Sequence, residues 1–229
     1  MSENLLRNLV LISNILTVIF SLSLGIYSIR RRYGDIIIRL WFFLCISVSV
    51  WCGSYIIIMT SVNGEIAHLF LRLVYFIASF IPILYFHFIS SFLFKNNKNK
   101  KIIFLGYFLA LVFIFLSIFS NFIVIGIKYL DGFGYTQNTN KIGLFLLIFY
   151  FLLYIFLSIY LLIREYFSSI GYKKRQILFI LAASLFGFVG GMSNFIFDLL
   201  GIYPFGQVIV WIFPLVITYG IFLPSRIKN

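Results

Sequence analysis

The side chains that could do chemistry are few, and they lie near the ends of long apolar runs. His68 and Arg72 are four residues apart, which places them on one face of a helix. Asn194 and Asp198 have the same spacing in a later run. Charged groups within a helical bundle are costly and usually face a partner or an aqueous cavity. The pattern allows an Arg72–Asp198 pair or a site where Arg72 meets an anionic ligand, but the simpler interpretation is that these side chains extend to lipid headgroups.

A second set of residues is of interest as a switch. His87 lies deeper in the run that holds Arg72, where an imidazole could carry a proton or sense pH. The sequence favours the simpler interpretation of a neutral histidine hydrogen-bonded to a neighbouring helix. Pro82 in the same run and Pro214 in the last run each remove a backbone hydrogen bond, and we expect both to kink their helices.

Other chemistries lack the residues that they need. Cys45 and Cys52 are seven apart, about 10 Å along a helix, which is too far for a disulfide. With only two histidines in the chain, a metal site has no support. The motifs GxxxxGK[ST], HExxH and GxSxG do not occur. We therefore expect no metal, no cofactor and no catalytic residue.

The elements that must position these residues are membrane helices. Of 229 residues, 62% are hydrophobic and 10% are charged, whereas soluble domains are about 25% charged. Seven apolar runs are long enough to cross about 30 Å of hydrocarbon, and helices satisfy their backbone groups there. The sequence predicts an all-α membrane protein, a seven-transmembrane-helix bundle forming one domain over residues 1–229. The predicted spans cover about residues 9–29, 36–60, 67–94, 102–127, 142–163, 177–200 and 207–223.

The basic residues predict the orientation of the bundle. Of the 18 Lys and Arg residues, 14 fall in loops on one side, and such loops face the cytoplasm. The N-terminus is therefore expected outside and the C-terminus inside. Anionic lipid attracts the same residues, so the net charge of +12 reflects topology, and we expect a lipid bilayer and no nucleic acid as partner.

Two further features concern packing. The longest loop on the outer side, residues 128–141, combines glycines, aromatic residues and amides, which suits a folded cap or a binding lid; the alternative is a solvated connector. In the sixth run, Ala183, Gly187 and Gly191 recur every four residues beside Gly190. Such a face of small residues allows close helix packing, most simply within the chain.

The third run resembles the third helix of the seven-helix N-terminal module of bacterial histidine kinases. The pattern there is an Arg, an aromatic residue, a Pro and a His-Phe pair. In this chain these residues are Arg72, Tyr75, Pro82, His87 and Phe88. The sixth and seventh runs resemble the same module in a basic residue plus Gln, a glycine-rich middle, an Asn and Pro-x-Gly. The matching residues there include Arg175, Gln176, Pro204 and Gly206.

The resemblance covers nearly the whole chain and implies a module that receives a signal and passes it to a cytoplasmic kinase or cyclase. Here only PSRIKN follows Leu223, and Pro224 disfavours a continued helix. Kinase activity is therefore not carried over. The output is expected to pass through a separate cytoplasmic partner at the basic loops 95–101 and 164–176, or through a homodimer.

We therefore expect a stand-alone membrane sensor or receptor, multi-pass in a cell membrane of the bacterial inner-membrane kind, and not an enzyme. It would bind an unknown small or lipophilic ligand in the outer half of the bundle. The candidate ligand-binding residues are His68, Arg72, Tyr75, Asn194 and Asp198. The alternatives are a permease or small integral subunit of a transport complex, and a membrane scaffold without ligand. An intramembrane enzyme is least favoured, because no nucleophile–base pair is visible.

Overall fold

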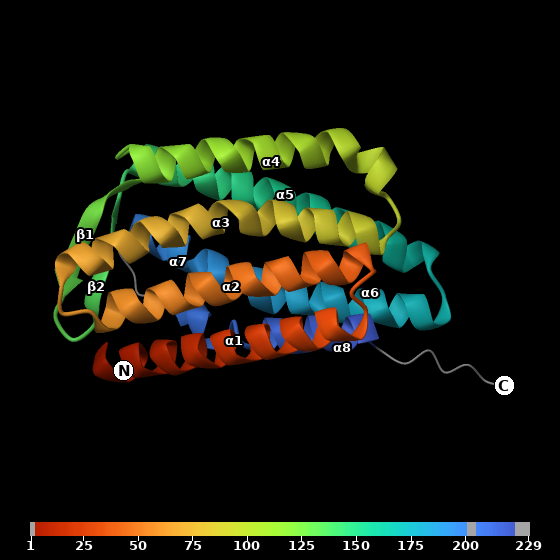
Figure 1. Ribbon diagram of the computed structural model, residues 1–229, viewed down its shortest axis with the longest axis horizontal. Coiled ribbons are helices and arrows are strands. Elements are labelled where there is room, and N and C mark those ends of the chain that lie inside the picture. Colours follow the sequence, from red (N-terminus) through yellow and green to blue (C-terminus); the bar gives the residue numbers. More distant parts are fainter. Residues whose placement is uncertain (1–2, 201–204, 223–229) are drawn as a thin grey trace.

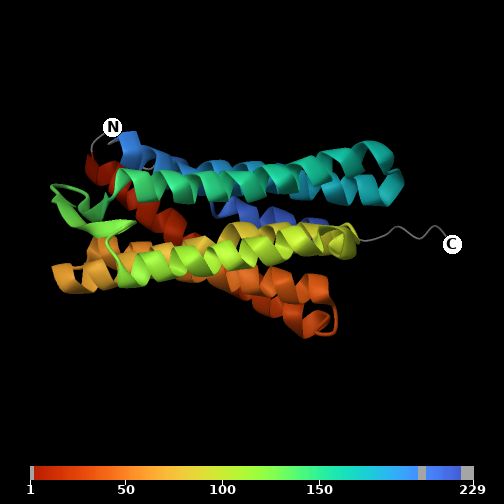
Figure 2. The ribbon, with the colours of Figure 1, turned by 90° about the horizontal axis from the view of Figure 1, so that it is seen from above.

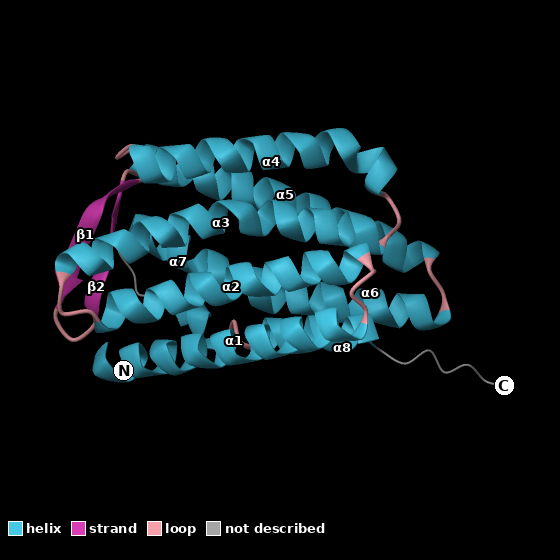
Figure 3. Ribbon diagram, viewed as in Figure 1, coloured by secondary structure: helices cyan, strands magenta, loops and turns pink. Residues whose placement is uncertain are grey.

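The computed structural model describes residues 3–200 and 205–222, so Pro204, Pro224 and the side chain of Asp198 lie outside the described part. The chain forms an elongated bundle of helices with a β-hairpin at one end (Figures 1 and 3). The elements are α1 Glu3–Arg31, α2 Ile36–Thr60, α3 Gly64–Phe92, α4 Asn96–Phe119, β1 Val124–Leu130, β2 Gly134–Thr139, α5 Lys141–Ser168, α6 Gly171–Ser184, π-helix η1 Leu185–Val189, α7 Gly190–Leu200, 3-10 helix η2 Phe205–Ile209 and α8 Ile212–Phe222. The π-helix η1 joins α6 and α7 within one span.

Six helical segments are long and apolar enough to cross a membrane, and a shorter apolar one spans Gly206–Phe222. The predicted seven-helix membrane bundle is therefore confirmed. We call the end that carries the β-hairpin the hairpin end. The opposite end carries the α1–α2, α3–α4 and α5–α6 connections with their lysines and arginines, and we call it the basic end (Figure 1).

The helices α2, α3 and α5 begin where polar side chains cap their free N–H groups. Asp35 accepts a hydrogen bond from the backbone N–H of Ile37 at 2.9 Å and starts α2. Asn63 caps α3 in the same way, and Asn140 caps α5. Such caps satisfy N–H groups that have no partner within the helix, so they set the points where the chain re-enters the bundle.

The helices form two layers, one with α2, α3 and α4 and the other with α5, α6 and α7, and α8 lies between them (Figure 2). The core is formed chiefly by α2 and α3, whose Trp41, Tyr75 and Tyr85 are fully buried. Apolar residues of α4 point outward instead, among them Phe104 and Phe119. Outward apolar side chains suit contact with lipid tails, which replace water as the solvent of a membrane helix.

The fourth predicted span was too long, because it reached Ile127 while α4 ends at Phe119. The apolar residues that follow belong to β1, which pairs antiparallel with β2. The helix ends where Ser120 accepts a hydrogen bond from the backbone N–H of Phe122 at 3.2 Å. A short apolar run rich in β-branched residues fits a strand as well as a helix, so periodicity alone did not separate the two.

The last two spans are also less regular than predicted. The sixth is interrupted by the π-helix η1, and the seventh starts as the short 3-10 helix η2 before α8 begins at Ile212. Pro214 was expected to kink a continuous helix, but it is the third residue of α8. A proline in the first helical turn removes an N–H that has no intrahelical partner, so Pro214 helps to start α8. Pro82 lies within α3, which continues through it.

Candidate functional site

At the hairpin end, the Gln137 side chain extends from β2 into the bundle. The Gln137 side-chain oxygen accepts hydrogen bonds from the hydroxyl groups of Tyr55 at 3.1 Å and Tyr75 at 3.0 Å. Its Nε2 donates to the backbone carbonyl of Asn194 at 3.2 Å. Gln137 thus connects α2, α3 and α7 through the hairpin. We call Gln137, Tyr55, Tyr75 and Asn194 the polar cluster.

The strand geometry explains why Gln137 points inward. Successive side chains of a strand point to opposite faces, and Gln137 is buried while Asn138 is exposed. The turn before β2 is fixed to α2, because Gly134 has a positive φ of 100° and lies against the carbonyl oxygen of Met59. The loop of residues 128–141 therefore folds as a cap, one of the two alternatives that its composition left open.

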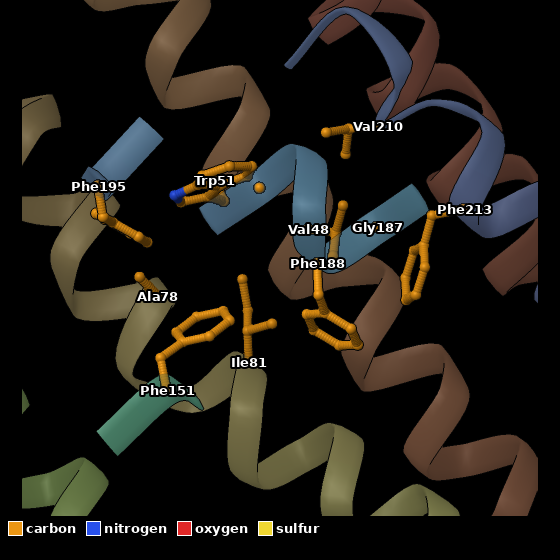
Figure 4. A pocket seen from close by; sticks show the side chains of 11 residues that line it. Val48, Trp51, Ala78, Ile81, Phe151, Gly187, Phe188, Phe195, Val210 and Phe213 are labelled. Carbon is orange, nitrogen blue, oxygen red and sulfur yellow. The ribbon is translucent and has the colours of Figure 1, made fainter. Parts of the chain in front are cut away.

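An apolar cavity lies between the two layers (Figure 4). The cavity is small, with a volume of about 30 Å³. The space is narrow, so a ligand larger than a few atoms must widen it. Its lining consists of Val48, Trp51, Ala78, Ile81, Phe151, Gly187, Phe188, Gly191, Phe195, Val210 and Phe213.

Aromatic contacts join the polar cluster to this cavity. The Trp51 ring meets Tyr55 edge to face, with ring centroids 5.3 Å apart. Phe195 meets Tyr75 with centroids 5.7 Å apart. Trp51 and Phe195 line the cavity while Tyr55 and Tyr75 bind Gln137, so the cluster lies directly at the cavity wall.

The π-helix η1 supplies one wall of the cavity, with Gly187 and Phe188 in the lining. A Cβ at Gly187 would lie 2.2 Å from the Phe213 ring, and one at Gly190 would lie 2.7 Å from the carbonyl oxygen of Gly206. The small residues of this span therefore pack within the chain, as predicted. Single π-turns inside α-helices are rare and frequently occur at functional sites.

The predicted ligand-binding residues separate into two groups. Tyr75 and Asn194 meet in the polar cluster. Arg72 instead contacts the end of α4, where it donates to the carbonyl of Ile118 and, at 3.1 Å, to the Asn121 side chain. His68 is beside it, with Nε2 3.4 Å from the Arg72 Nε. A guanidinium at a helix C-terminus stabilises unpaired carbonyl groups, so the described contacts of Arg72 are those of a helix cap.

His87 lies away from this site. Its Nδ1 is 3.0 Å from the Tyr107 hydroxyl, and the half-buried imidazole meets that ring edge to face. The contact joins α3 to α4. Among its described neighbours, His87 has this one side-chain hydrogen bond, which is the arrangement expected of a histidine that connects neighbouring helices.

The basic end is held by polar contacts of its own. Lys95 forms an ion pair with Glu165 at 2.6 Å between the α3–α4 connection and α5. Gln176 Nε2 donates to the carbonyl groups of Gly220 at 3.1 Å and Ile221 at 3.3 Å, which connects α6 to the end of α8. The elements α6, η1 and α7 form one span. Its η1 part lines the cavity, and its Gln176, near the basic end, contacts the end of α8.

Comparison with known proteins bears on this arrangement. A family described as the N-terminal 7TM region of histidine kinase matches residues 13–224. The chain belongs to this family. No curated protein matches it. It is therefore a multi-pass membrane protein with the sensor region of two-component signalling, and that region is the non-catalytic part of such kinases.

Sequence reasoning missed three residues of the site. Gln137 was within a loop that was recognised only as a whole, and Tyr55 and Trp51 looked like ordinary core residues of a helix. A buried Tyr or Trp usually finds a partner for its polar atom. That rule flags such residues but does not say which helix or strand supplies the partner.

Proposed function

We propose that this sensor region binds a small lipophilic molecule in the cavity between its two layers and passes the change to a cytoplasmic signalling partner at the basic end. The observation that carries the proposal is the apolar cavity, whose wall is formed in part by a π-helix. Ligand sites are lined mostly by apolar side chains and often lie between the helices of a bundle, as this cavity does.

The narrowness of the cavity gives the coupling its physical basis. A ligand that fits only after the layers separate binds the open arrangement more tightly than the closed one. Differential affinity of this kind shifts the population toward the open arrangement. The wall that must yield is η1, because a π-turn can return to α-helical geometry by moving one residue along the helix.

Such a movement would reach the basic end through the same span. A change at η1 displaces α6, whose Gln176 holds the final carbonyl groups of α8. We propose that the basic loops 95–101 and 164–176 lie on the cytoplasmic side, where anionic lipid and the positive-inside rule favour them. The end of α8 lies beside them, and a cytoplasmic partner would read its position.

Cavity filling tests the proposal. Gly191→Ala places a methyl group in the cavity 3.7 Å from the Trp51 ring, an ordinary contact that needs no rearrangement. Gly53→Ala is the matched control, because a Cβ there meets nothing within 4 Å. Both exchanges raise helix propensity by a similar amount, up to about 1 kcal/mol.

The purified protein in detergent micelles is titrated with the apolar probe α-methylstyrene, and its unfolding midpoint is followed by circular dichroism. We expect a saturable rise of the midpoint for the wild type and for Gly53→Ala, reduced to less than half in Gly191→Ala. A linear drift that is the same in all three proteins means that the probe only partitions into the micelle. That result refutes the cavity as the binding site and favours the scaffold interpretation.

A further inference from the structure

A polar pocket opens at the basic end and shares no lining residue with the apolar cavity. Its volume is about 490 Å³. It lies between the ends of α1, α3 and α8 and the starts of α2 and α6. The charged residues in its lining are Arg31, Arg32, Lys173 and Asp35. The lining therefore carries three positive charges and one negative charge, and we call it the basic pocket.

The cationic groups themselves lie at the wall of the basic pocket. The guanidinium carbons of Arg31 and Arg32 lie 5.5 Å and 5.8 Å from the centroid of the Phe222 ring. The Lys173 Nζ lies 3.7 Å from the centroid of the Phe92 ring and donates to the Phe92 carbonyl at 3.0 Å. Phe92 and Phe222 both line the pocket. Contacts between cations and aromatic rings thus hold the three positive charges against rings that form the pocket wall.

None of these three cations forms an ion pair with a carboxylate among the residues that the structure describes. Glu165, whose charge also acts on Lys173, is the ion-pair partner of Lys95. Asp35 already caps α2 through its Oδ1. Residues 223–229 contain two basic residues and no acidic one. Positive charges that gather in one place repel each other, so an anion from outside the chain would stabilise the basic pocket.

The position of the basic pocket favours a lipid phosphate as that anion. The membrane-spanning helices α1 and α3 end there, and α2 and α6 begin there. Charged side chains at the ends of such helices lie at the level of the lipid headgroups. Arg31 also lines a shallow hollow on α1, together with the exposed side chains of Ile26 and Tyr27. The exposed face of α1 thus continues from the pocket toward the middle of the membrane, where acyl chains lie.

We propose that the basic pocket binds the phosphate group of one anionic phospholipid, whose acyl chains lie along α1. Arg31, Arg32 and Lys173 donate to the phosphate oxygens, because arginine and lysine are the side chains that proteins use to bind phosphate. Basic pockets between membrane helices bind lipid headgroups in this way. The site differs from a general attraction of anionic lipid to the basic loops, because it holds a single molecule. It does not depend on the ligand of the apolar cavity.

Native mass spectrometry tests the proposal, because it counts the lipid molecules that each chain holds. The purified full chain in a neutral detergent is titrated with phosphatidylglycerol, which is anionic, and separately with phosphatidylcholine, which has no net charge. We expect one molecule of phosphatidylglycerol to bind per chain about fivefold or more tightly than phosphatidylcholine, since a basic side chain near a membrane surface adds about that factor in affinity for anionic lipid.

The variants Arg32→Gln and Lys173→Gln each remove one cation from the basic pocket, and they do so from different elements. We expect each to weaken phosphatidylglycerol binding about fivefold and to leave phosphatidylcholine binding unchanged. Arg175→Gln is the matched control, because Arg175 is exposed, lies two residues after Lys173 on α6 and does not line the pocket. It removes the same charge from the same end and should bind phosphatidylglycerol like the wild type. Circular dichroism checks that each variant is folded.

Three results would overturn the proposal. Equal weakening in Arg175→Gln and Arg32→Gln means that surface charge attracts the lipid without a pocket. Equal affinity of the wild type for the two lipids means that the anion is not recognised. A titration with sn-glycerol 3-phosphate supplies the phosphate without acyl chains; if this compound binds as tightly as phosphatidylglycerol, the occupant is a soluble phosphate ester and the lipid assignment is wrong. The apolar cavity is tested separately by the α-methylstyrene titration.

Discussion

Replacing Gln137 tests whether one side chain fixes the hairpin to the bundle. Gln137→Leu keeps a side chain of similar size but removes two hydrogen bonds from tyrosine hydroxyl groups and one to the carbonyl of Asn194. Each bond contributes about 0.5–1.5 kcal/mol net, so the docked hairpin loses about 3 kcal/mol. Because 1.4 kcal/mol corresponds to a factor of ten, the undocked population rises about a hundredfold.

Hydrogen exchange measured by mass spectrometry reads this population directly, because exchange in the fast-closing regime follows the free energy of local opening. We expect amides of residues 124–139 to exchange about a hundredfold faster in Gln137→Leu, while α5 is unaffected. Asn138→Leu is the control, since it changes the next side chain of β2 on the exposed face. If the two variants exchange within a factor of two of each other, the polar cluster does not hold the hairpin and the reasoning is wrong.

Three further predictions concern the hairpin turn and the basic end. Gly134→Ala should speed hairpin exchange at least tenfold, because its Cβ would lie 2.5 Å from a backbone carbonyl oxygen of α2, whereas Gly126→Ala, in open space, should not. Glu165→Gln removes the partly exposed ion pair with Lys95 and should lower the free energy of unfolding in a denaturant titration by about 0.5–1 kcal/mol, a difference that should shrink in high salt. Gln176→Leu should cost about 1–3 kcal/mol in the same titration, because two carbonyl groups of α8 lose their donor; an unchanged midpoint would contradict that contact.

Much of the fold follows from local rules. Apolar runs of sufficient length predicted the seven helical segments, and the caps Asp35, Asn63 and Asn140 lie where the runs begin. The face of small residues around Gly187 predicted close packing within the chain. These features depend on the solvent and on neighbours along one helix, which is the information that a linear pattern contains.

The site was less accessible to such reasoning. Tyr75 and Asn194 were expected to bind a ligand, and the fold brings them together. Arg72 was grouped with them because it is charged and lies on the same span, but its contacts are with the end of α4. Arg72 and Tyr75 are three residues apart on α3, a spacing that places them on one face only approximately. When a helix is apolar on all sides, its sequence does not reveal which neighbouring helix each side chain contacts.

The sequence by itself determined that the chain crosses a membrane and how many helical segments it has. Each of these depends on how a segment of the chain partitions between water and lipid, an energy that is summed locally. Only the tertiary structure decided that Gln137 joins the hairpin to three helices and that η1 is a π-helix at a cavity wall. Those arrangements depend on contacts between residues far apart in the chain, such as the rings of Trp51 and Phe195 at one cavity. A pattern read along the chain does not contain that information.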